Sequence, residues 1–96
     1  MGNEILKAVA KELTVLYSNF KKNKDISNYD EHINVCINNL LYALKYTTDN
    51  AALDFYRSDL AIYELPILQS RKNEIISKAK ERQVQLALER LERDFG

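Results

Sequence analysis

Apolar residues near the start of the chain recur at intervals of three and four positions. Between Asn3 and Lys22 this spacing places seven of them on one side of a helix. They are Ile5, Leu6, Val9, Leu13, Leu16, Tyr17 and Phe20. After a polar and basic stretch, Asn28 and Glu31 have the spacing of a helix-capping pair. The pattern predicts a first helix, a loop, and a second helix that begins near Tyr29.

The second predicted helix, from about Tyr29 to Tyr46, is apolar on two sides. One side carries Ile33, Cys36, Ile37, Leu40, Leu41 and Leu44. Val35, Tyr42 and Tyr46 lie within about 40° of one another on nearly the opposite side. These three residues, called the tyrosine face below, match the aromatic anchors that dominate binding hot spots. We interpret the tyrosine face as a candidate partner surface; the alternative is that the third or fourth helix packs on it.

A third helical pattern follows the polar connection 47–50, whose Thr, Asp and Asn side chains are good helix caps. Helical spacing resumes after it at Ala52, Leu53, Tyr56, Leu60 and Tyr63. Tyr56 and Tyr63 are expected to be core residues whose hydroxyl groups reach water. Pro66 lacks the amide that would continue the helix, so a break or kink is expected near Leu65. We favour a break; the alternative is one bent helix.

The last predicted helix, from Ile67 to Asp94, is long. At about 1.5 Å per residue it extends roughly 42 Å, against roughly 30 Å for the first. Leu68, Ile75, Ile76 and Ala79 form its first apolar group, and Val84, Ala87, Leu88, Leu91 and Phe95 form a second after a polar stretch. An exposed apolar stripe is unusual in a monomer. We therefore expect residues 80–96 to be an overhanging oligomerisation helix that makes contact through Val84, Leu88, Leu91 and Phe95.

Composition fits a single helical domain over 1–96. Of the 96 residues, 46% are hydrophobic and 29% charged, and two Gly and one Pro leave few tight turns. We predict an all-α, up-down bundle of four helices with a long C-terminal helix. The longest apolar run, 40–44, is far short of the roughly 20 residues that span a bilayer. With the single Cys36 and no signal-type start, this predicts a cytoplasmic protein.

The charge balance bears on the choice of partner. Fourteen basic residues equal fourteen acidic ones, whereas nucleic-acid binders usually have a basic excess. We therefore expect no nucleic-acid partner. A nucleic-acid-binding regulator is kept as an alternative, and it would use Lys21, Lys22 and Lys24 or Lys78, Lys80 and Arg82. The range 27–66 is acidic and both flanking segments are basic, which indicates neighbouring helices of one bundle or, alternatively, a charge-guided partner surface.

Catalytic and cofactor motifs are missing from the sequence. Glycine occurs only at positions 2 and 96, so no phosphate-binding loop is possible. His32 and Cys36 are one helical turn apart, but no second His or Cys completes the four ligands of a structural zinc site. Tyr29 occupies the position where a di-iron bundle has Glu. We expect no metal, no cofactor and no enzymatic activity, with Cys36 packed as a buried thiol.

The leading functional hypothesis is a small non-enzymatic binding or adaptor protein that acts as a homodimer through its last helix. In length and predicted four-helix layout, the chain is similar to the small immunity proteins that protect bacteria from pediocin-like bacteriocins. The abundant Asn and Lys suit a low-GC bacterium or its phage. This resemblance covers the layout and carries no residue over. It implies the second hypothesis, an inhibitor that neutralises a toxin or blocks a receptor.

Overall fold

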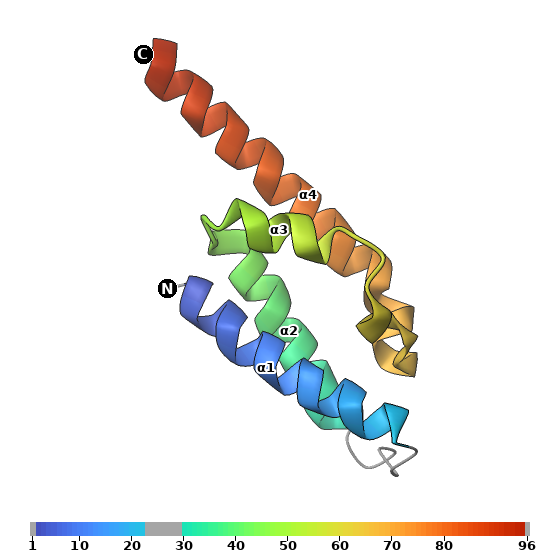
Figure 1. Ribbon diagram of the computed structural model, residues 1–96. Helices are drawn as coiled ribbons and strands as arrows, with labels where there is room; N and C mark the ends of the chain where they lie inside the picture. The colour runs from blue at the N-terminus through green and yellow to red at the C-terminus, as the bar shows by residue number, and fades with distance from the viewer. Residues whose placement is uncertain (1, 23–29, 96) are drawn as a thin grey trace.

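The computed structural model describes residues 2–22 and 30–95. They form α1 (Gly2–Lys21), α2 (Asp30–Tyr46), α3 (Asn50–Tyr56), the 3-10 helix η2 (Ala61–Glu64) and α4 (Pro66–Phe95). No strand occurs in these ranges. The helices pack into an elongated bundle of 54 × 23 × 18 Å, and the C-terminal part of α4 projects beyond the others (Figure 1). The predicted all-α bundle with a long last helix is confirmed. The cap predicted at Asn28 lies outside the described residues.

Contacts between side chains fix the directions of the helices. The pairs Asn3–Thr47 and Glu12–His32 join α1 to α2, whereas Asn34–Arg71 and Arg82 with the Thr47 carbonyl join α2 to α4. From the first pair to the second, the residue number rises along α1 and falls along α2. From the third pair to the fourth, it rises along both α2 and α4. Helices α1 and α2 are therefore antiparallel, and α2 and α4 are parallel. The return between them is made by α3 and η2 together (Figure 1).

The core consists of the periodic apolar positions of α1, α2 and the first part of α4. Buried residues include Leu6, Val9, Leu13, Leu16, Ile33, Cys36, Ile37, Leu40, Leu44, Leu68, Ile75 and Ala79. Leu41 and Ile76, expected on the same stripes, are only partly buried. Removing each large apolar side chain from water contributes about 1.5–3 kcal/mol before conformational entropy is counted. Apolar spacing therefore predicted most of the core correctly.

Thr47 is the buried junction between the helices at one end of the bundle. Its hydroxyl donates to the Asn3 side chain of α1, and it accepts from the Asp49 backbone N–H at 3.1 Å. The Arg82 Nε of α4 donates to the Thr47 carbonyl at 2.8 Å. Asp49 is the N-cap of α3 and accepts from the Ala52 N–H at 3.2 Å. The capping role predicted for the connection 47–50 is thus confirmed, and the connection also holds α1 and α4.

The third helix is shorter than the apolar spacing predicts. It ends at Tyr56, and Leu60 and Tyr63 belong to an irregular segment and η2. The Tyr63 hydroxyl donates to the Tyr56 carbonyl at 2.8 Å, which satisfies a C-terminal carbonyl of α3 and favours an early end to the helix. The expectation that the Tyr63 hydroxyl reaches water is therefore wrong. Burial raises the pKa of both tyrosines.

The predicted break before Pro66 is confirmed. Leu65 has an extended conformation with ψ of 129°, and its carbonyl accepts from the Gln69 N–H at 2.7 Å. Pro66 is thus the first residue of α4, where a missing N–H costs nothing because that N–H has no intrahelical acceptor. A single bent helix from Asn50 onward is excluded.

Candidate functional site

Four large apolar side chains lie exposed along the projecting part of α4. Val84 is 60% exposed, Leu88 55%, Leu91 51% and Phe95 86%. Steps of four, three and four residues place them within about 60° of one another on the helix. They are called the C-terminal stripe below. The structure therefore brings together four of the residues that the sequence proposed for partner contact.

Leu86 marks how far the core extends along α4. It is only 9% exposed, although it lies between exposed residues of the stripe. At about 100° per residue, Leu86 points about 160° away from both Val84 and Leu88. One side of α4 therefore still packs on the bundle at Leu86, while the stripe faces away. The sequence prediction missed this because the grouping of Val84, Ala87 and Leu88 left Leu86 unassigned.

The tyrosine face is also open in the structure. Val35, Tyr42 and Tyr46 are 51%, 47% and 48% exposed. The two tyrosine rings pack against each other with centroids 4.9 Å apart, and the Lys45 ammonium lies 5.5 Å from the Tyr46 ring centroid. The third and fourth helices leave this face half exposed, so it is a surface separate from the bundle core.

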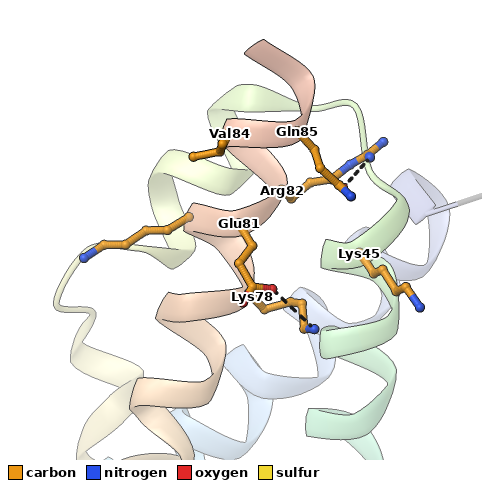
Figure 2. Close-up of a pocket in the computed structure, with 7 residues that line it drawn as sticks. Lys45, Lys78, Glu81, Arg82, Val84 and Gln85 are labelled. Atoms are coloured by element: carbon orange, nitrogen blue, oxygen red, sulfur yellow. Dashed lines mark hydrogen bonds and ion pairs between the residues drawn. The ribbon is translucent and has the colours of Figure 1, made fainter. Parts of the chain in front are cut away.

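A pocket of about 540 Å³ lies between the end of α2 and the middle of α4 (Figure 2). Its lining residues are Lys45, Lys78, Lys80, Glu81, Arg82, Val84 and Gln85. Lys78 lies 3.7 Å from Glu81, and Arg82 donates to Gln85 at 3.1 Å, as Figure 2 shows. The lining includes four basic residues and one acidic residue, so it carries a net positive charge in a chain without net charge. Val84 belongs to both the pocket and the C-terminal stripe, which makes the two surfaces continuous.

A second polar cluster joins α1 to α2. The Glu12 carboxylate Oε1 lies 2.7 Å from the His32 Nε2, and the Cys36 Sγ lies 3.9 Å from the same nitrogen. Cys36 is buried, and Glu12 and His32 are about half exposed. Burial, and then the negative charge of Glu12, raise the pKa of the thiol. Sequence reasoning paired His32 with Cys36 and missed Glu12, because the carboxylate lies 20 residues away on another helix.

This arrangement does not match a nucleophilic triad. In such a triad the thiol and the carboxylate bind different ring nitrogens, so that the imidazole can take a proton from one side while held from the other. Here Glu12 and Cys36 both approach Nε2 of His32. The cluster therefore brings three different donor atoms to one place without forming a proton relay.

Comparison of the chain with protein-family models, with curated proteins and with solved structures finds no match. In the described ranges, 2–22 and 30–95, no helix has the length and apolar character needed to cross a membrane. The resemblance in layout to bacteriocin immunity proteins stays a prediction.

Proposed function

We propose that this protein is a non-enzymatic interaction module, an adaptor that forms a homodimer through the C-terminal stripe of α4. The observation that carries the proposal is the exposure of four large apolar side chains on the side of α4 that faces away from the core. Covering apolar surface contributes about 25 cal/mol per Å² removed from water. A second copy of the same helix supplies a surface of matching shape and chemistry.

The spacing of the stripe supports a helix as the binding partner. Steps of four, three and four residues are those of the a and d positions in a coiled coil, where each side chain inserts between four of the facing helix. The stripe covers about two heptads. A coiled coil usually needs at least about three heptads, so the dimer needs further contacts beside this short seam.

Charges beside the stripe favour an antiparallel pair. Lys78 and Lys80 flank its beginning, and Glu92 and Asp94 flank its end. Two parallel copies would place acid beside acid at one end and base beside base at the other. In an antiparallel pair, the basic beginning of each stripe, with Lys78 and Lys80, lies toward the acidic end of the other, with Glu92 and Asp94. That arrangement directs the acidic end of one helix, with its Phe95, toward the basic pocket of the other.

The test is solution mass by light scattering over a concentration series. We expect the wild-type chain to dimerise as concentration rises and Leu88→Glu with Leu91→Glu to remain monomeric with an unchanged far-ultraviolet circular dichroism spectrum. Val15→Glu is the matched control, because Val15 is 54% exposed on α1, away from the stripe. A wild-type chain that stays monomeric at the highest concentration would contradict the proposal, as would a double variant that still dimerises.

The orientation of the pair is tested by exchanging charges. Lys80→Glu and Asp94→Lys should each weaken the dimer, because each places like charges opposite one another. Combining the two should restore it, since every cross-pair is again of opposite sign. Arg93→Glu serves as the control, because Arg93 points about 160° away from Leu91. If the combined variant is weaker than both single variants, the antiparallel arrangement is wrong.

We further propose that the tyrosine face binds a different protein, which gives the adaptor its second surface. Its support is the half-exposed, mutually packed pair of Tyr42 and Tyr46, since tyrosine buries a large area at low entropic cost. Because this face lies on α2 and the stripe on α4, Tyr42→Ala should leave the mass of the dimer unchanged. A shift toward monomer in that variant would place Tyr42 in the self-association surface and contradict the separation of the two faces.

A further inference from the structure

Glu12, His32 and Cys36 place three metal-binding atoms within 4.8 Å of one another. With the usual zinc bond lengths, a tetrahedral site separates a carboxylate oxygen from an imidazole nitrogen by about 3.3 Å, and a thiolate sulfur from that nitrogen by about 3.5 Å. The two distances here are 2.7 Å and 3.9 Å. One is shorter and the other longer than the ideal. A tetrahedral site therefore requires the oxygen–nitrogen distance to lengthen by about 0.6 Å and the sulfur–nitrogen distance to shorten by about 0.4 Å.

We propose that Glu12, His32 and Cys36 bind one zinc ion that joins α1 to α2, with water as the fourth ligand. His32 and Cys36 are one turn apart on α2, so both reach the same side of the helix. Glu12 reaches them from the facing helix. The thiol lies buried at the base of the cluster, while Glu12 and His32 are half exposed. The ion therefore enters from solvent, and its outer position is open to water.

The donor set selects the class of metal. Calcium and magnesium prefer six or more oxygen ligands, and this cluster offers one carboxylate. Thiolate and imidazole suit zinc and its spectroscopic substitute cobalt. When the ion binds, the Cys36 thiol releases its proton to solvent, and sulfur, nitrogen and oxygen each donate an electron pair to the metal. No oxidant or reductant takes part. This inference is independent of the dimer proposed above.

Cobalt titration of the reduced full chain tests the site. We expect a thiolate-to-cobalt charge-transfer band together with the visible absorption of tetrahedral cobalt, saturating at one ion per chain and removed by zinc. His32→Gln and Cys36→Ser should abolish the charge-transfer band, and Glu12→Gln should weaken cobalt binding at least tenfold. Glu31→Gln is the matched control, because it changes a neighbouring acid on α2 outside the cluster.

Zinc should also raise the thermal midpoint of the wild-type protein in a concentration-dependent way and leave that of His32→Gln unchanged. His32 is half exposed, so this variant tests the site even if Cys36→Ser folds poorly. Three results would overturn the proposal: no charge-transfer band with wild-type protein, binding by Glu12→Gln equal to wild type, or saturation at one ion per two chains. Light scattering with and without zinc shows whether zinc changes the oligomeric state, so failure of the metal site is distinguished from failure of the proposed dimer.

Discussion

Two leucines of α4 that are two residues apart, Leu86 and Leu88, test where the core ends and the contact surface begins. Leu86 is 9% exposed and Leu88 is 55% exposed. Replacing a buried leucine by alanine costs about 2–5 kcal/mol through lost transfer energy and the cavity left behind. Leu86 lies near the end of the core, where neighbours can relax, so we expect the lower part of that range, about 2 kcal/mol. Leu88→Ala should cost roughly 0.5 kcal/mol in the monomer, as surface substitutions do.

The two variants are compared by urea unfolding and by thermal unfolding, both followed by circular dichroism at a concentration low enough for the chain to be monomeric. Leu86→Ala should lower the thermal midpoint by roughly 8–16 °C in a domain of this size. Leu88→Ala should leave the midpoint nearly unchanged and instead raise the dissociation constant of the dimer. Equal losses of stability would show that α4 packs on the bundle with both faces. A larger loss at Leu88 would refute the division between core and stripe altogether.

Three further substitutions probe the junctions of the fold and its second surface. Tyr63→Phe leaves the Tyr56 carbonyl without its buried donor and should lower the free energy of unfolding by about 1–3 kcal/mol, measured by urea denaturation. Arg82→Gln removes the hydrogen bond to the Thr47 carbonyl; because Arg82 is partly exposed, a loss of about 1 kcal/mol is expected in the same assay. Tyr42→Ala should cost less than about 1 kcal/mol, since a loss of 3–5 kcal/mol would mean a buried ring.

Helix periodicity predicted α1, α2 and α4 well because each places a long apolar stripe on one side. It failed for the third helix, where Leu60 and Tyr63 keep helical spacing and yet lie outside α3. Spacing reports which residues share a face if a helix forms. It does not report a long-range bond such as that from Tyr63 to the Tyr56 carbonyl, which favours the early end of α3.

Prediction of the candidate surfaces has the same limit: sequence spacing finds residues that share one helix face but not contacts between helices. The stripe and the tyrosine face were predictable because their members lie on one helix each. The part that Glu12 plays in the cluster with His32 and Cys36 could not be predicted, because its approach to His32 depends on how α1 packs on α2. Gly2 is a further example: a Cβ atom there would lie 2.8 Å from the Thr47 nitrogen, a close approach that no local pattern indicates. Contacts between elements required the structure.

The position of the C-terminal stripe follows from the junction at Thr47. Arg82 binds the Thr47 carbonyl two residues before the stripe begins, and Leu86 is buried beneath its first half. Beyond Leu86, nine residues continue the same helix for about 14 Å. The stripe is therefore held in a fixed direction by contacts already made in the monomer. Little conformational entropy remains to be lost when a second copy binds, and a short apolar seam can then support association that it could not support on a flexible tail.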